Sequence, residues 1–189
     1  TTFVFANGLR ADKIDEDILK ALKQIGVLSV GFGVESGNQR ILNNIKKDIE
    51  LETVRKAYKL AKKMGFETWG FFIIGLPGEN KKTVQDTINF AKELDPDFAK
   101  FLILKPFPGS EVFKELDKDN LIFDFNYDHY GVYTPPVHNL KDLTAEDMIN
   151  LQKKAFRDFY LRPGKIFQHL IRMRSITQLK LNIKSSSFV

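Results

Sequence analysis

The sequence contains no cysteine among its 189 residues. This excludes disulfide bonds, and it excludes any zinc or iron–sulfur site built on cysteine ligands within these residues. The three histidines, His129, His138 and His169, lie far apart and do not show metal-ligand spacing. We expect each to be an ordinary surface or loop histidine. The chain is therefore predicted to supply no metal ligand, and we assign it no catalytic residue.

Long apolar runs are also missing. No stretch is long enough to span a membrane, and no signal peptide opens the sequence, so we expect a cytoplasmic protein. Hydrophobic residues make up 43% of the chain and charged residues 28%, which is typical of a globular protein with a sizeable core.

The formal net charge is +5. The lysines are spread over predicted helix faces and do not form a basic cluster interleaved with stacking aromatics. This pattern favours a solvated basic surface over nucleic-acid binding, and nucleic acid is not an expected partner.

The most informative stretch is GFFIIGLPGE, residues 70–79. Its short apolar run predicts a buried strand over 71–74, which ends at Gly75 and turns sharply through Pro77 and Gly78. In α/β proteins, a rigid turn at the carboxyl end of a buried parallel strand is a common ligand site.

The same strand–turn–helix unit recurs along the chain. Strands are predicted over 2–6, 27–34, 66–74 and 98–105, and helices over 15–25, 38–47, 51–64, 80–94 and from Glu111. We expect Ile18, Leu22 and Ile25 to form the buried stripe of the first helix. The predicted fold is α/β, with about four parallel strands and right-handed crossovers.

The periodicity changes after residue 116, so we divide the chain into 1–116 and 117–189. The first part of the second region is irregular and rich in aromatics. The aromatics of 123–136 could line a pocket for a flat or greasy substrate, but local packing is the favoured interpretation. Thr144 and Asp147 predict a capped helix, another helix follows over 165–174, and the chain ends in a basic tail.

Four predicted strands end in polar or glycine-rich turns, which read NGLR, GVESG, GLPGE and PFPGS. In a parallel barrel these ends meet on one face, so a shared ligand site is favoured over a purely structural origin.

The individual residues leave alternatives open. Glu35 and Ser36 offer acceptors suited to ribose hydroxyls or an ammonium group, but Glu35 is equally well explained as a helix-start acid. Lys47 suits a ligand carboxylate, although an exposed helix-end lysine is the simpler interpretation. Arg10 needs either an acid, such as Asp12 or Glu35, or an anionic ligand. Glu79 is best explained as a helix-start acid.

Several motifs are excluded. GFGVESG lacks the spacing of the dinucleotide fingerprint, and GLPGE lacks the Gly-Lys-Ser/Thr ending of a P-loop. No Ser-His-Asp arrangement is indicated.

The motifs NGLRAD, GVESGNQRILNNIKK, FFIIGLPGE and PFPGS, in this order, resemble the later strands of radical S-adenosylmethionine (radical SAM) enzymes. FYLRP, residues 159–163, resembles the tail of the cobalamin-associated class, which includes the anaerobic magnesium-protoporphyrin cyclase and hopanoid methylase relatives. PFPGS differs from the motif of tRNA-modifying methylthiotransferases, which have an arginine before the glycine.

The resemblance implies part of a triosephosphate-isomerase-like (TIM-like) (β/α) barrel with a helical carboxy-terminal extension. It also implies S-adenosylmethionine (SAM) contacts. The resemblance places Glu35 and Ser36 at the ribose and methionine parts of SAM, and Lys47 at the methionyl carboxylate. It places beside adenine the residues Ile73, Ile74, Gly75 and Pro77. Along the same pocket it places Lys105, Pro106 and Phe107, and it implies a less direct contact for Arg10.

The departure from the family is equally clear. Its CxxxCxxC loop, which holds the 4Fe-4S cluster, and its glycine-rich SAM motif are both absent. The resemblance therefore implies the carboxy-terminal part of a longer enzyme, inactive without the missing amino-terminal barrel half. The parent would cleave SAM to a deoxyadenosyl radical or support methyl transfer on a small-molecule substrate, and any cobalamin would bind outside this chain.

Two other readings remain. One is a cysteine-free, degenerate barrel that acts as a binding module without catalysis. The other is a barrel fragment for an unrelated phosphate or sugar ligand, for which GLPGE is a poor loop.

Overall fold

The structure is a computed structural model that describes residues 3–4 and 8–172. The remaining residues of the predicted first strand and the basic tail lie outside the described residues.

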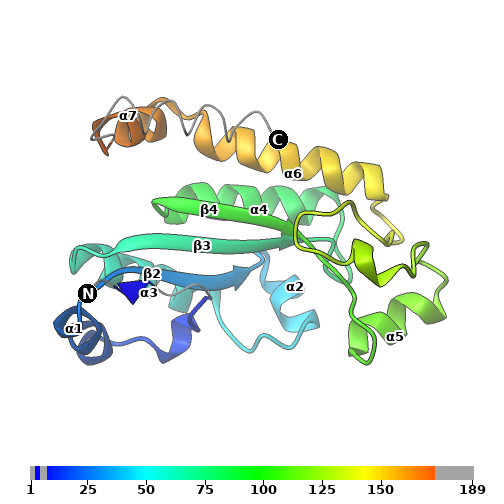
Figure 1. Cartoon of the computed structure of the whole chain (residues 1–189), viewed down its shortest axis with the longest axis horizontal. Coiled ribbons are helices and arrows are strands. Elements are labelled where there is room, and N and C mark those ends of the chain that lie inside the picture. The colour runs from blue at the N-terminus through cyan, green and yellow to red at the C-terminus, as the bar shows by residue number, and fades with distance from the viewer. Residues whose placement is uncertain (1–2, 5–7, 173–189) are drawn as a thin grey trace.

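Four parallel strands form one sheet in the order β1-β2-β3-β4 (Figure 1). They are β1 (Phe3–Val4), β2 (Val27–Glu35), β3 (Glu67–Ile74) and β4 (Phe98–Ile103). The strands coincide with the apolar, β-branched and aromatic runs of the sequence, which suit a sheet with buried faces. The predicted α/β fold with four parallel strands is confirmed.

Helices alternate with these strands and follow the predicted ranges closely. They are η1 (Ala11–Lys13), α1 (Glu16–Gln24), α2 (Gln39–Asn44), α3 (Leu51–Lys63), α4 (Lys81–Leu94), α5 (Glu111–Lys118), η2 (Tyr127–His129), α6 (Ala145–Tyr160) and α7 (Pro163–Arg172). The capping box of Thr144 and Asp147 is formed, which confirms the predicted start of α6.

The prediction of which residues form the buried stripe of α1 is wrong for Ile18 and Ile25. Ile18 is 40% exposed and Ile25 59% exposed, whereas Leu19 is completely buried and Leu22 packs against the core. Either phase fits the 3.6-residue period of a short amphipathic helix, and only the contact with the sheet selects one.

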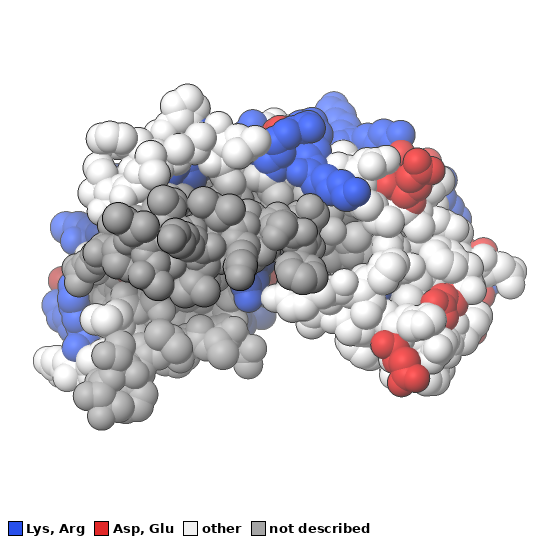
Figure 2. Space-filling model, turned by 45° about the horizontal axis from the view of Figure 1, so that its top comes forward, with Lys and Arg blue, Asp and Glu red and all other residues white. Residues whose placement is uncertain are grey.

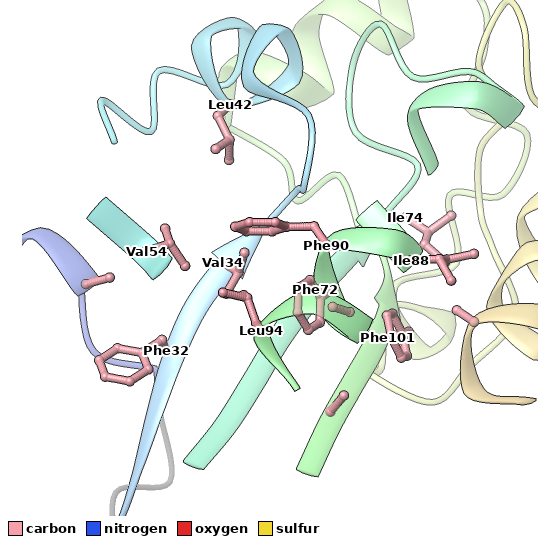
Figure 3. Packing of buried hydrophobic residues seen from close by; sticks show 14 of the residues in the cluster. Phe32, Val34, Leu42, Val54, Phe72, Ile74, Ile88, Phe90, Leu94 and Phe101 are labelled. Atoms are coloured by element: carbon pink, nitrogen blue, oxygen red, sulfur yellow. The ribbon is translucent and has the colours of Figure 1, made fainter. Parts of the chain in front are cut away.

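The two faces of the sheet differ. Side chains that alternate along the strands, such as Phe32, Phe72 and Phe101, are fully buried on one face. Figure 3 shows Phe72 and Phe101 near Ile88 of α4. The ring of Phe32 packs instead against Tyr58 of α3, with ring centroids 4.8 Å apart. In Figure 1, α3 and α4 lie behind the strands on this face. The opposite face, turned toward the viewer, carries no helix among the described residues, and its side chains in β3 and β4 are half-buried.

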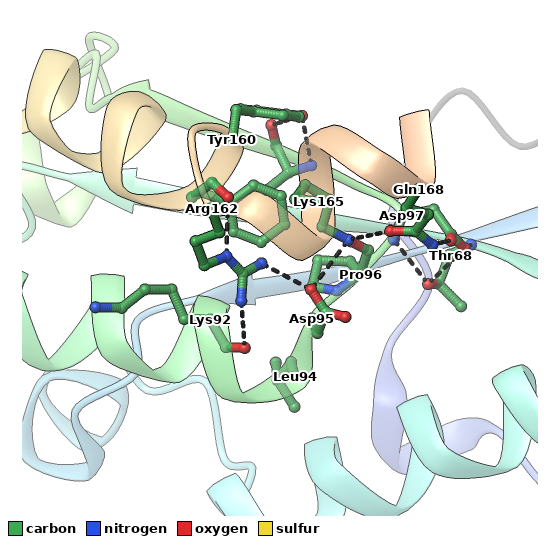
Figure 4. Close-up of polar contacts among 12 residues, drawn as sticks. Thr68, Lys92, Leu94, Asp95, Pro96, Asp97, Tyr160, Arg162, Lys165 and Gln168 are labelled. Carbon is green, nitrogen blue, oxygen red and sulfur yellow. Dashed lines mark hydrogen bonds and ion pairs between the residues drawn. The ribbon is translucent and has the colours of Figure 1, made fainter. Parts of the chain in front are cut away.

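The carboxy-terminal helices are fastened to the connection between α4 and β4 (Figure 4). The guanidinium of Arg162 donates to the carbonyl of Lys92 at 3.1 Å and to the carboxylate of Asp95 at 2.7 Å. The buried amine of Lys165 donates to the carbonyl of Pro96 at 2.7 Å and pairs with Asp95 at 3.0 Å. The FYLRPGK segment thus caps the end of α4 and holds α6 beside the sheet.

Side chains of α6 cover the free edge of β4. The hydroxyl of Tyr160 accepts from the amide of Ala99 at 2.9 Å and donates to its carbonyl at 2.8 Å. The amide of Gln152 donates to the carbonyl of Phe101 at 2.7 Å. The helix therefore satisfies backbone groups that would otherwise invite a further strand.

None of the helices that the structure describes has the length and apolar character needed to cross a lipid bilayer.

Candidate functional site

The carboxyl ends of the strands meet at one edge of the sheet, as the sequence predicts. Glu35 at the end of β2 is paired with Phe72 of β3, and Ile74 is paired with Ile103 of β4. The carbonyl of Ile74 then accepts from the amide of Leu104 at 2.9 Å, which holds the two outgoing turns together.

Glu35 and Lys47 form an ion pair at this edge. Their Oε1 and Nζ atoms are 2.8 Å apart, and the side chains are 19% and 18% exposed. The carboxylate folds back over Gly33, where an added Cβ atom would lie only 2.7 Å from Oε1. A glycine on the open face of β2 therefore makes room for the charged pair.

The simpler interpretations of these two residues are wrong. The helix after β2 is capped by Asn38, so Glu35 is not its N-terminal acid. Lys47 is largely shielded because the chain reverses after α2 through Lys46 and Asp48, both at positive φ. This reversal, which carries no glycine, returns Lys47 to the end of β2.

Arg10 pairs with Asp12, one of the partners considered. Their closest contact is 2.9 Å, and the guanidinium also donates to the backbone carbonyl of Lys47 at 3.2 Å. The hydrogen bond from Arg10 lowers the pKa of the Asp12 carboxyl. Arg10 thus stands next to the Glu35–Lys47 pair, at the exposed side of the site.

Ser36 lies at the same edge, but its side chain points into the protein. It is completely buried, and its hydroxyl lies 3.1 Å from the hydroxyl of Thr87 in α4. The amide of Gly37 donates to the same Thr87 hydroxyl at 2.9 Å. Ser36 and Thr87 therefore fix the turn after β2 against α4.

The turn after β3 is held by Glu79. Its Oε2 atom accepts from the amides of Gly75 and Leu76, at 2.8 and 3.1 Å, while Asn80 caps α4. The interpretation of Glu79 as a helix-start acid is wrong, because the side chain folds back into the turn and only 1% of the residue is exposed.

Burial raises the pKa of Glu79 to about 7, even though the two backbone hydrogen bonds act in the opposite direction. Its Oε1 atom has no hydrogen-bond partner among the described residues. Near neutral pH this carboxyl group is poised between its protonated and ionised forms.

His138 lies beneath the same turn, and of the two expected alternatives it is a loop histidine and not a surface one. It is fully buried, and its Nε2 atom is 3.3 Å from the carbonyl oxygen of Gly75. An isolated antiparallel bridge to Ile122 brings it there from the irregular segment. Burial lowers the pKa of His138, which favours the neutral ring.

The other predicted site residues divide between the open face of the sheet and buried positions. Ile73 is half-buried on the open face, whereas Ile74 belongs to the core on the opposite face. Gly75, at φ 92°, sits too close to His138 and Met148 to accept a Cβ atom. Pro77 is buried within the turn.

The segment after β4 is also partly structural. The amine of Lys105 donates to the carbonyls of His129 and Thr134, at 3.2 Å each, and to that of Pro135. Desolvation lowers its pKa. Pro106 is buried, and Phe107 is 57% exposed. Lys105 thus anchors the aromatic segment, and the exposed ring of Phe107 lies 5.9 Å from the ring of Tyr130.

Sequence reasoning missed Thr87 and the roles of Glu79 and His138. Nothing in the helical pattern marks Thr87, because it occupies an ordinary core position of α4. Glu79 follows a glycine-proline turn, which is a weak signal on its own.

Residues 1–91 match the radical SAM superfamily. The chain belongs to this superfamily.

Two known proteins are similar to the chain in sequence. A protein of Pyrococcus horikoshii, described as an uncharacterised methyltransferase, is 40% identical over 164 residues, which are 85% of this chain and 36% of that protein. The anaerobic magnesium-protoporphyrin IX monomethyl ester cyclase of Rubrivivax gelatinosus is 32% identical over 121 residues, covering 64% of this chain and 21% of the cyclase.

Two solved structures share the fold. Coproporphyrinogen III oxidase of Escherichia coli, a radical SAM enzyme, superposes with a TM-score of 0.59 at 18% identity, over 82% of this chain and 31% of that chain. The methyltransferase TsrM of Kitasatospora setae, bound to cobalamin and a [4Fe-4S] cluster, superposes with a TM-score of 0.53 at 21% identity. This match covers 58% of this chain and 22% of the TsrM chain. The chain spans between a fifth and about a third of these proteins.

Proposed function

We propose that this chain forms part of the SAM site of a radical SAM enzyme that acts on a small molecule, with methyl transfer as the favoured reaction. The observation that carries the proposal is the Glu35–Lys47 pair, folded over Gly33 beside the Gly75 turn. It places a carboxylate and an ammonium group, only partly shielded, at the carboxyl edge of a parallel sheet.

The donor set fits SAM. The Glu35 carboxylate would accept hydrogen bonds from the ribose hydroxyls. The amine of Lys47 would leave its ion pair with Glu35 and bind the methionyl carboxylate of SAM instead. Ile73 and the Gly75–Pro77 turn would pack beside adenine, with Phe107 at the rim. Ser36, Ile74, Lys105 and Pro106 would support this surface, and Arg10 would hold the backbone of Lys47.

The chain does not fit a 4Fe-4S cluster. It has no cysteine, and the described residues contain no group of three side chains suited to hold a metal ion. When bound to the parent enzyme, the cluster would supply the electron for SAM cleavage. Its ligands, the first barrel strands and any cobalamin site would belong to other segments.

The proposal includes the division of the chain near residue 116 into a barrel part and an extension. It also includes a cytoplasmic location, because thiolate ligands of a cluster persist in a reducing compartment. We expect this chain alone to bind SAM weakly and to leave it uncleaved.

The test is ligand-detected NMR of SAM with the chain. Saturation transferred from the protein should reach the adenine and ribose protons more than the sulfonium methyl protons. Lys47→Met should reduce SAM affinity about tenfold, as expected for loss of one charge-assisted contact. Lys20→Met, which alters an exposed lysine of α1, is the matched control and should bind SAM as the unsubstituted chain does.

The second candidate is a binding module without catalysis, which the absence of cysteine favours. The SAM-site proposal and the binding module differ in whether the chain binds SAM. Absence of any transfer to SAM, with an intact protein spectrum, would remove the SAM-site proposal and leave the binding module.

A further inference from the structure

A hollow lies along β4, away from the Glu35–Lys47 pair. It is a groove with a cavity volume of about 500 Å³, bounded by β4, by α6 and by a short loop of the irregular segment. The residues along it run from Phe98 at the start of β4 to Ile103 at its end. Because Ile103 is paired with Ile74, the upper end of the groove lies next to the Gly75 turn.

The floor of the groove is aromatic. Trp69 and Phe98, neighbours on paired strands, stack with ring centroids 4.4 Å apart and an interplanar angle of 24°. Both side chains are half-buried on the open face of the sheet, and the Phe98 ring also lies 5.3 Å from the His169 ring of α7. Because the two rings stack on each other, they present their apolar edges to a ligand ring in the groove.

A lysine stands over this floor. The amine of Lys100 is 5.7 Å from the ring centre of Trp69 and 5.9 Å from that of Phe71. Its side chain has no hydrogen bond or ion pair to any described residue. The nearby acid Glu67 instead accepts from the indole of Trp69 at 3.0 Å. Lys100 is therefore a half-buried cation without a counter-ion, which favours an incoming anion.

The charge of the groove is of one sign. Its lining includes the two lysines Lys100 and Lys153 and no aspartate or glutamate. On the face shown in Figure 2, basic side chains gather over the upper central surface, while acidic ones lie mostly toward the right-hand end. A cationic ligand would be repelled, and an extended peptide strand would find the edge groups of Ala99 and Phe101 already bonded.

We propose that this groove binds a planar aromatic carboxylate, with its ring packed against the edges of Trp69 and Phe98 and its carboxylate bound to Lys100. Within the enzyme, and resting on the proposed function, this groove is the substrate side of the SAM site, because it ends at the Gly75 turn. The exposed side chains of Val132 and Tyr133 form its rim.

The chain contains a single tryptophan, so the groove can be observed directly. In a nitrogen–proton correlation spectrum, the one indole signal belongs to Trp69. We expect naphthalene-2-carboxylate to shift this signal in a saturable manner, without SAM present. The neutral analogue 2-naphthamide should bind at least tenfold more weakly, because it offers no charge to Lys100.

Lys100→Met keeps an unbranched apolar stem that is one atom shorter and uncharged. It should weaken naphthalene-2-carboxylate binding about tenfold while leaving 2-naphthamide binding unchanged. Lys82→Met is the matched control, since Lys82 is an exposed lysine of α4 outside the groove, and it should have no effect. The spectrum itself reports whether each variant is folded.

Three results would overturn the inference: no saturable shift of the indole signal, equal affinity for the carboxylate and the amide, or no effect of Lys100→Met. Concentration-dependent line broadening without ligand would instead assign the groove to a second copy of this chain, which also overturns it. Because SAM is absent from the experiment, failure here leaves the SAM-site proposal standing, and the reverse also holds.

Discussion

Glu79 is the residue whose chemistry is most constrained by its surroundings, because its carboxyl group is buried and still serves two backbone amides. In the unfolded chain its pKa is near 4.5, and in the folded protein it is about 7. Between these values the folded state holds a proton that the unfolded state has released. Stability from this group is therefore present below pH 4.5 and is lost as the pH rises toward 7.

Glu79→Gln should remove this dependence while keeping an oxygen acceptor for the Gly75 and Leu76 amides. Urea unfolding should show that, relative to the variant, the unsubstituted protein loses about 2.5 kcal/mol between pH 5 and pH 8. The buried His138 acts in the opposite direction below its usual pKa, but it is present in both proteins and its effect cancels in the difference. A difference that does not change with pH would contradict the assignment.

At the residue scale, the sequence predicts the chemistry of the site better than its contacts. Glu35 and Arg10 were identifiable as charged groups at strand ends and Lys47 as one at a helix end, and the structure brings them together. The pairing of Glu35 with Lys47 depends on the backbone reversal at Lys46 and Asp48. This reversal contains no glycine, so the sequence does not indicate it. The burial of His138 depends on a bridge formed by an aperiodic segment, so local sequence gives no sign of it.

At the scale of elements, the turn after β2 is fitted closely against α4. A Cβ atom added at Gly37 would lie 2.5 Å from the Cβ of Phe90, 2.8 Å from the Cα of Thr87 and 2.9 Å from the carbonyl of Asp86. Two of these three atoms belong to the helix backbone and cannot move aside alone.

Gly37→Ala should therefore destabilise the protein by about 2–3 kcal/mol, because α4 must shift away from β2. Thermal or urea unfolding would measure this. Gly164→Ala is the control, since an added Cβ atom there meets nothing within 4 Å, and its stability should stay within about 0.5 kcal/mol. Equal stability of the two variants would show that the contact between the turn and α4 is loose.

The contact between α6 and β4 gives a second prediction at this scale. Tyr160→Phe removes the hydroxyl that serves both backbone groups of Ala99, so it should cost about 1–2 kcal/mol and speed hydrogen exchange at the Ala99 amide. Tyr133→Phe, at a side chain that is 85% exposed, should change neither quantity. An unchanged exchange rate in Tyr160→Phe would mean that the helix does not protect this edge.

Element positions were predictable because apolar runs and helical periods are local properties, and the four parallel strands appear where these patterns place them. The phase of α1 was not predictable. Ile18, Leu22 and Ile25 form as good a stripe as one that includes Leu19, and the choice depends on packing against distant strands.

At the scale of the whole molecule, the sheet presents two different faces. One is sealed by helices around Phe32, Phe72 and Phe101, and the other carries the charged edge and the aromatic groove. A sequence can show that both faces are apolar enough for burial. It cannot show which half-buried side chains, such as Trp69 and Lys100, share one hollow, because this depends on the register between β3 and β4.

We propose that this chain supplies SAM contacts to an enzyme whose cluster is held by other segments. The most direct measurement is the intact mass and iron content of the native protein, purified without oxygen. The account predicts a polypeptide longer than 189 residues that carries about four irons per cluster. A native protein of this size without iron would contradict it and favour a binding module.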